Sequence, residues 1–157
     1  MKTYFLLIIF LLFTIKVSAQ EESESIVSKG FVLVAAGKNY EAIKKQASEV
    51  AKKINYKLNL RDLEYNKDEG LSFTKDICDE QGMEYPTYIP RGYWDSGEYV
   101  SVEYSSAYEG FTPGYYLIIV SSHDKGNPEL KAALQHVKKY YKSAYIKYAD
   151  MEMGYLH

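Results

Sequence analysis

The stretch "YYLIIVSSHDKGNPELKAALQHV", from Tyr115 to Val137, predicts a strand, a polar loop and a helix. Residues 115–121 are mostly apolar, aromatic and β-branched, as in an inner strand. Asn127 is a favourable N-cap, and Pro128 takes the first helical position, where its missing N–H costs nothing. Four apolar residues then follow at the spacing of one helix face: Leu130, Leu134, Val137 and Tyr141.

The same order of elements occurs earlier, in "FVLVAAGKNYEAIKKQASEV" from Phe31 to Val50. A short apolar run at 31–36 predicts a strand, and Asn39 is again a good N-cap. The helical stripe that follows consists of Tyr40, Ile43, Ala47, Val50, Ala51 and Ile54. Each helix is followed by a further predicted strand, "YKLNL" at 56–60 and "AYIKYADM" at 144–151.

Two strand–helix–strand units predict an α+β fold. We expect a two-layer sandwich with a ferredoxin-like βαβ repeat, a mostly antiparallel sheet and two helices on one face. Residues 61–97 between the units predict an irregular insertion, with one turn of helix within 72–80. Residues 99–105 then predict a strand that forms an antiparallel hairpin with the strand from Tyr115, through a tight connection. Val100 and Val102 are expected on one face of this strand, and Ser101 and Glu103 on the other.

The first residues, "MKTYFLLIIFLLFTIKVSA", are typical of a signal peptide, with one early Lys, an apolar run and small residues before the cleavage site. The apolar run is shorter than the roughly 20 residues that a membrane-spanning helix needs. We therefore predict a signal peptide at 1–19, cleavage near Ala19, a flexible lead-in at 20–30 and a single domain at 31–157. The mature protein is expected to be periplasmic or secreted.

The charge of the mature chain argues against some partners, and its cysteine content excludes a disulfide and a lipid-anchor cysteine. Without the two lysines of the signal peptide, 17 basic residues stand against 21 acidic ones, so the mature net charge is −4. No basic block favours nucleic acid or anionic lipid, and we predict neither as a partner. Cys78 is the single cysteine, which excludes an internal disulfide and a lipid-anchor cysteine at the cleavage site. We expect Cys78 to be a small buried apolar residue.

No residue pattern predicts catalysis. His123, His136 and His157 show no metal-ligand spacing, and no serine stands in a nucleophile elbow. We therefore predict no catalytic residue, no metal and no cofactor.

Tyrosine is the unusual feature of the composition, with 17 residues. Aromatic residues gather with prolines and glycines between 85 and 99, where the tentative ligand-binding residues are Arg91, Tyr93, Trp94 and Tyr99. Trp, Tyr and Arg in one loop are typical of a contact hot spot. The alternative interpretation is that these rings pack over an open sheet face and complete the core.

The two units resemble the halves of a SPOR (sporulation-related repeat) domain. The resemblance covers Phe31–Leu60 and Tyr115–Met151, with Tyr116 and Ile118 matching the second central strand of that family. It implies a βαββαβ sheet backed by two helices, and non-catalytic binding of peptidoglycan glycan strands on the open sheet face. This chain departs from the family in the long segment 61–114, which either covers that face or replaces it with an aromatic surface of its own.

The resulting expectation is an exported, tyrosine-rich, non-catalytic module of the cell envelope that binds peptidoglycan. The alternative is a periplasmic or secreted module that binds an envelope protein, of inhibitor or immunity type, since a mildly acidic aromatic surface suits a basic target. An envelope hydrolase is a third alternative, with no motif in its support.

Overall fold

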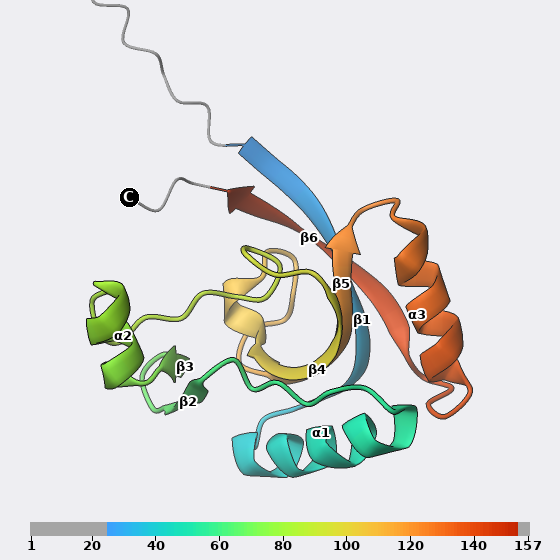
Figure 1. Cartoon of the computed structure of the whole chain (residues 1–157), viewed down its shortest axis with the longest axis horizontal. Coiled ribbons are helices and arrows are strands. Elements are labelled where there is room, and N and C mark those ends of the chain that lie inside the picture. The colour runs from blue at the N-terminus through green and yellow to red at the C-terminus, as the bar shows by residue number, and fades with distance from the viewer. Residues whose placement is uncertain (1–24, 154–157) are drawn as a thin grey trace, which may run out of the picture.

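The computed structural model describes residues 25–153 (Figure 1). The predicted signal peptide and residues 20–24 of the predicted lead-in lie outside the described residues. The elements in chain order are β1 (Ser25–Gly37), α1 (Tyr40–Ile54), β2 (Leu63–Asn66), β3 (Gly70–Phe73), α2 (Lys75–Gln81), β4 (Gly97–Tyr104), the 3₁₀ turn η1 (Ser105–Ala107), β5 (Tyr116–Asp124), α3 (Pro128–Lys138) and β6 (Tyr145–Met153).

The main sheet has the strand order β4-β5-β1-β6, and all three neighbouring pairs are antiparallel. If β1, β4, β5 and β6 are taken as the four strands of a βαββαβ chain, this is the order of the ferredoxin-like split βαβ unit. The predicted α+β sandwich with a mostly antiparallel sheet is therefore confirmed, as is the predicted pairing of β4 with β5.

Both long helices begin where the sequence predicts. The Asn39 side chain accepts from the backbone N–H of Ala42, and the Asn127 side chain accepts from that of Glu129. All six residues of the first predicted stripe are buried in α1, and α3 buries Leu130, Ala133 and Val137. The two helices lie on the same side of the sheet (Figure 1).

Alternation along the strands gives the sheet two apolar faces. The helix face carries Val32 and Val34 of β1 with Val100, Val102, Ile118 and Val120, which form the main core with α1 and α3. The opposite face, here called the second face, carries a smaller core of Phe31, Leu33, Leu117, Ile119, Ala149 and Met151. The predicted orientation of β4 is confirmed, because Val100 and Val102 lie in the main core.

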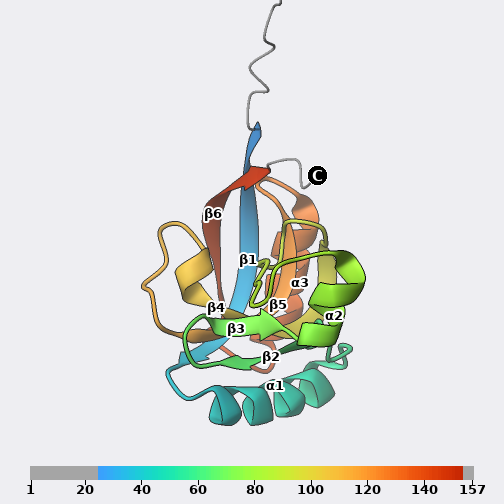
Figure 2. The same cartoon turned by 90° about the vertical axis from the view of Figure 1, so that its left-hand side faces the viewer.

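The insertion after α1 is more regular than predicted. Strands β2 and β3 form an antiparallel hairpin, and α2 follows with Thr74 as its N-cap (Figure 2). The Asn66 side chain accepts from the N–H groups of Asp68 and Glu69, which closes the turn of the hairpin. Leu71, Phe73 and the fully buried Cys78 extend the main core, so the expectation of a buried Cys78 is confirmed.

Three local predictions are wrong. Residues 56–60 form only an isolated parallel bridge, Leu58 to Val100, because β4 and not this segment pairs with β5. Residues 25–30 are not a flexible lead-in, because they pair with β6 along the first half of β1. The connection after β4 is not tight: residues 105–115 include η1 and cover part of the second face.

Within residues 25–153, no helix combines the length and the apolar character needed to cross a membrane.

Candidate functional site

Arg91, predicted as a ligand-binding residue, is fully buried against the second face. Its Nη1 donates to the carbonyl oxygens of Tyr99 and Ile119 at 2.8 and 3.1 Å, and its Nη2 donates to that of Gly97 at 2.7 Å. Further bonds reach the hydroxyl groups of two serines, Ser101 and Ser122. With these partners, Arg91 fastens the insertion to β4 and β5 and is not exposed to a ligand.

The carbonyls that Arg91 binds lie beside a β-bulge. The register of β4 on β5 shifts between Glu98 and Ser101, so β4 has one residue more than its partner at this point. The planar guanidinium of Arg91 donates as a set to carbonyl oxygens of both strands beside this bulge. At the same bulge Val100 bonds with Lys57 and Asn59, which accounts for the parallel bridge of residues 56–60.

Tyr99 also serves this packing. Its ring lies under the Arg91 guanidinium, 3.5 Å from the central carbon, and its hydroxyl donates to Asp95. Burial, partly offset by Arg91, together with the bond to Asp95, raises the pKa of Tyr99 above its ordinary value. Asp95 pairs with Arg61 Nε at 3.3 Å and accepts from the Gly92 N–H at 3.2 Å.

The two remaining predicted site residues differ in exposure. Tyr93 is partly buried and packs against both cores. Trp94 is 60% exposed, at the tip of the turn that Arg91 and Asp95 hold. Gly92 lets this turn approach the sheet: its φ is +103°, and a Cβ atom there would lie 3.0 Å from Met151 Sδ. Three of the four predicted residues therefore lie in one loop and Tyr99 lies on β4, and of the four only Trp94 is an exposed residue.

Beneath this loop lies a buried carboxylate that sequence reasoning did not select. Glu103 is fully buried on β4, and its Oε2 accepts from Arg61 Nη1 at 2.9 Å and from the Tyr88 hydroxyl at 2.7 Å. Burial and the nearby Glu103 carboxylate raise the pKa of Tyr88 and of Tyr108 well above its ordinary value. The alternation of polar and apolar residues at 99–104 predicts that Glu103 faces away from the helices. It does not predict which residues contact the Glu103 carboxylate.

The second face is only partly covered. Residues 105–115 place Tyr108 and Phe111 over Phe31, with ring centroids 5.0 and 6.4 Å from it. Beyond Phe111 a pocket of about 210 Å³ remains open above the sheet. This pocket, here called the aromatic pocket, is lined by Leu33, Ala36, Phe111, Thr112, Tyr115, Leu117, Tyr145 and Lys147.

The aromatic pocket combines rings with positive charge. Lys147 Nζ lies 4.3 Å from the centroid of the Phe111 ring, and Lys38 Nζ lies 5.3 Å from that of Tyr115. Tyr145, on β6, is 51% exposed at the rim. Tyr116 and Ile118, the positions matched to the SPOR pattern, instead point to the helix face, where both are buried.

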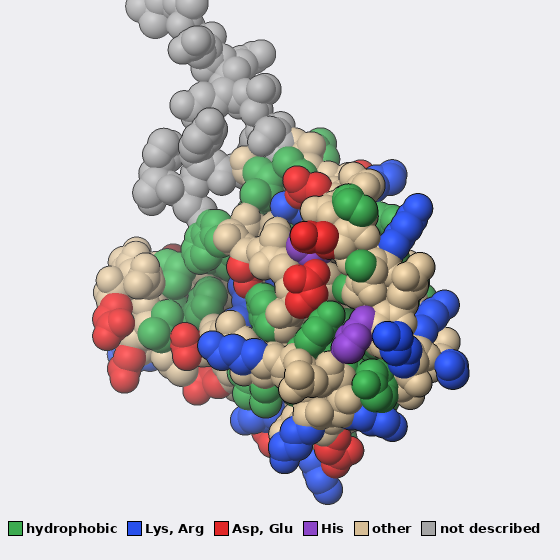
Figure 3. Space-filling model, turned by 45° about the vertical axis from the view of Figure 1, so that its right-hand side comes forward, with side chains coloured by type: hydrophobic (Ala, Val, Ile, Leu, Met, Phe, Trp, Pro, Cys, Tyr) green, Lys and Arg blue, Asp and Glu red, His purple; other side chains and the backbone are tan. Residues whose placement is uncertain are grey.

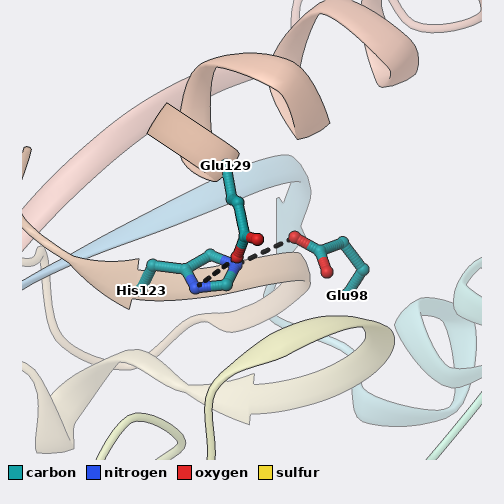
Figure 4. Close-up of side chains that lie close together, drawn as sticks. All are labelled: Glu98, His123 and Glu129. Atoms are coloured by element: carbon teal, nitrogen blue, oxygen red, sulfur yellow. Dashed lines mark hydrogen bonds and ion pairs between the residues drawn. The ribbon is translucent and has the colours of Figure 1, made fainter. Parts of the chain in front are cut away.

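A second group of polar residues comes together at the other end of β5. Glu98, His123 and Glu129 each offer one ligand atom, and these atoms lie within 4.8 Å of one another (Figure 4). They come from β4, β5 and the first turn of α3, so a search for histidine spacing within one helix could not find them. This is the place among residues 25–153 where a metal ion could be held.

Comparison with models of protein families, with curated proteins and with solved structures finds no match for this chain.

Proposed function

We propose that this protein is an exported, non-catalytic module that binds glycan strands of peptidoglycan. The proposal rests on the aromatic pocket, which lies on the sheet face opposite the two helices, the face that the SPOR resemblance makes the ligand face. The strand order supports the resemblance, because a split βαβ sheet backed by two helices is the arrangement it implies.

The chemistry of the pocket suits a sugar chain. Tyr145 and Tyr115 offer flat rings with a polar tip, which stack on the apolar face of a sugar ring while the hydroxyl group stays in water. The volume of about 210 Å³ is below the roughly 300–1,000 Å³ of pockets that enclose a drug-sized ligand. We infer that one sugar ring occupies the pocket while the strand continues across the rim.

The two lysines favour glycan that has lost its stem peptides. Hydrolysis of the amide that joins a stem peptide to the glycan leaves a carboxylate on the lactyl group of the sugar. Lys147 lines the pocket and Lys38 lies over the ring of Tyr115, which lines it; both would attract that carboxylate, with a strength that falls as salt increases. An intact stem peptide offers an amide at the same place and no such charge.

The proposal is tested by co-sedimentation of the chain from Gln20 to His157 with purified sacculi, before and after an amidase removes the stem peptides. We expect more protein in the pellet with the stripped glycan. Tyr145→Ala and Lys147→Ala should each weaken binding by about tenfold, the effect of losing one good contact. Tyr140→Ala is the matched control, since Tyr140 is 43% exposed but does not line the aromatic pocket.

Three results of this experiment would contradict the proposal. The first is absence of the unmodified chain from both pellets. The second is equal binding by the Tyr145→Ala variant, and the third is an equal loss of binding in the Tyr140→Ala control. A melting temperature within about 2 °C of the unmodified protein shows that a variant is folded, because a surface change usually alters stability by less than 0.5 kcal/mol.

A protein partner is the second candidate, and Trp94 favours it. An indole that is 60% exposed on a turn fixed by Asp95 and Arg91 loses little conformational freedom on binding. In a pulldown from envelope extract, we expect one protein to be recovered in equal amount with the chain, and to be lost with Trp94→Ala but kept with Tyr145→Ala. Recovery of no such protein, or its recovery with Trp94→Ala, would count against this candidate.

A further inference from the structure

Three side chains converge where β4, β5 and α3 meet, away from the aromatic pocket. His123, on β5, is 7% exposed, so its ring is held in place by the surrounding protein. Glu98 approaches from β4 and Glu129 from α3, and their carboxylates face the imidazole from different sides (Figure 4). On the molecular surface, acidic side chains gather beside histidine on this side of the protein (Figure 3).

The distances join each nitrogen of the ring to a carboxylate. His123 Nε2 lies 2.8 Å from Glu98 Oε1, and Nδ1 lies 3.4 Å from Glu129 Oε2. Two ligands bound at about 2.0–2.1 Å to a tetrahedral zinc ion are themselves about 3.3 Å apart. The 3.4 Å separation matches that value, and the 2.8 Å separation is about 0.5 Å shorter. Glu98 and Glu129 have side chains that are 35% and 63% exposed, so small adjustments are open to them.

The charge of the cluster calls for a cation. Among residues 25–153, His123 is the partner in the ion pairs that Glu98 and Glu129 make, and neither carboxylate pairs with a lysine or arginine. With a neutral imidazole the cluster carries two negative charges within 4.8 Å. Either a proton on the ring or a metal ion relieves this repulsion.

We propose that Glu98, His123 and Glu129 bind a divalent transition-metal ion, with Zn²⁺ as the best match. Imidazole and carboxylate are both common zinc ligands, whereas Ca²⁺ and Mg²⁺ select oxygen ligands alone. The ion takes one ring nitrogen and one oxygen of each carboxylate, since three such atoms lie within 4.8 Å of one another. This site is independent of the proposed glycan binding, since none of its residues lines the aromatic pocket.

The site leaves the metal open on one side. Glu98 and Glu129 border a groove of about 490 Å³ whose other walls are Tyr56, Ala132, Ala133 and His136. The two alanines keep the groove free of side-chain bulk, so a water molecule or an external ligand has room to complete the coordination. The α3 N-terminus beside Glu129 opposes a cation, and we expect weaker binding than at a closed four-ligand site.

His136 is the matched control because it shares the groove but has a different partner. Its Nε2 donates to the carbonyl oxygen of Ile54 at 2.8 Å, and its ring stacks on Tyr56. His136→Gln therefore removes an imidazole from the same groove without removing a proposed ligand.

The test is calorimetric titration of Zn²⁺ into the untagged chain from Gln20 to His157, first treated with a chelator. We expect one ion per chain, and at least tenfold weaker binding for His123→Asn and Glu129→Gln. The control His136→Gln should bind as the unmodified protein does. Co²⁺ added in place of Zn²⁺ should give the visible absorption of a four- or five-coordinate site, lost in the same two variants.

Absence of saturable binding, or equal binding by Glu129→Gln, would overturn the proposal and leave the cluster as a histidine bonded between two carboxylates. If His136→Gln weakened Zn²⁺ binding as much as His123→Asn does, the proposal would also be overturned, since the groove and not the three-residue cluster would then hold the ion. Glu129 is largely exposed, so Glu129→Gln is expected to fold even if His123→Asn does not.

Discussion

Arg61 and Glu103 form a buried ion pair that ties the insertion to the sheet. Arg61 Nη1 donates to Glu103 Oε2 at 2.9 Å, and the two side chains are 8% and 0% exposed. Burial opposes the charge on Arg61, but Glu103 and Asp95 outweigh it and raise its pKa above the ordinary value. The pair lies 42 residues apart in the chain, so it forms only when the insertion closes over β4.

We predict that removing one partner of this pair destabilises the protein strongly. Arg61→Met leaves a buried carboxylate without its charge partner, which typically costs about 3–5 kcal/mol. The double variant Arg61→Met/Glu103→Leu should recover part of this loss, because no unpaired charge remains. Urea unfolding measures both, with the exposed Glu49→Gln as a control expected within about 0.5 kcal/mol of the unmodified protein. A loss below 1 kcal/mol in Arg61→Met would contradict the prediction.

Arg91→Lys should also destabilise the protein although it keeps the charge. Lysine has a single ammonium group and cannot reach the carbonyls of Gly97, Tyr99 and Ile119 as the guanidinium does. Each buried carbonyl left without a donor costs about 1–3 kcal/mol, so we expect at least 2 kcal/mol in urea unfolding. Trp94→Ala, three residues along the same loop, should change stability little because Trp94 is 60% exposed. Similar stabilities for the two variants would show that Arg91 does not hold the loop.

Residue patterns predict those parts of this structure that depend on local spacing. The stripe of α1 and the N-caps Asn39 and Asn127 all appear as expected, because helix periodicity and capping act within a few residues. The sheet order follows from the repeated unit, since each helix packs its stripe on the same sheet.

The insertion and the two candidate sites depend on contacts between distant residues, and their arrangement could not be predicted. Arg91 is part of a loop with the composition of a binding surface, yet a bulge in β4 makes it a buried support. Glu98, His123 and Glu129 meet only because the start of β4, the end of β5 and the start of α3 lie near one another. Asn66 and Gly70 bracket the turn between β2 and β3, and these two turn-forming residues are the signal in the sequence that favours a hairpin there.

High pH should destabilise the protein by favouring ionisation of the buried Tyr116. Burial, with neighbouring tyrosines, raises the pKa of Tyr116 to about 12. Its neutral form is favoured in the folded state, so its stabilising contribution is complete below about pH 10 and is lost as the pH rises through 12. We expect the stability of the unmodified protein, relative to Tyr116→Phe, to fall by about 2–3 kcal/mol between pH 9 and 12. Parallel stability curves for the two proteins would contradict this.

Low pH should lower the stability of the protein through protonation of Asp95. Burial opposes its ionisation, but the Arg61 guanidinium and the bonds from Tyr99 and Gly92 outweigh burial and hold the pKa of Asp95 below its ordinary value. Its contribution to stability is therefore present above about pH 4, the value of an unfolded aspartate, and is lost as the pH falls through the folded pKa. Asp95→Asn should be less stable than the unmodified protein at pH 7, and the difference should shrink toward pH 2. An unchanged difference across that range would contradict the prediction.

Replacing Phe111 shows whether residues 105–115, which cover part of the second face, form the proposed glycan site or block it. Its ring packs on Phe31 and Tyr108 on one side and lines the aromatic pocket on the other, under Lys147. If the cover forms the site, Phe111→Ala removes one wall and should weaken binding to stripped sacculi by about tenfold. If the cover blocks a wider face, the same change should strengthen binding. We expect the weaker binding, because Lys147 loses the ring that holds it at the pocket. Tyr140→Ala, outside the aromatic pocket, is the control and should bind as the unmodified protein does.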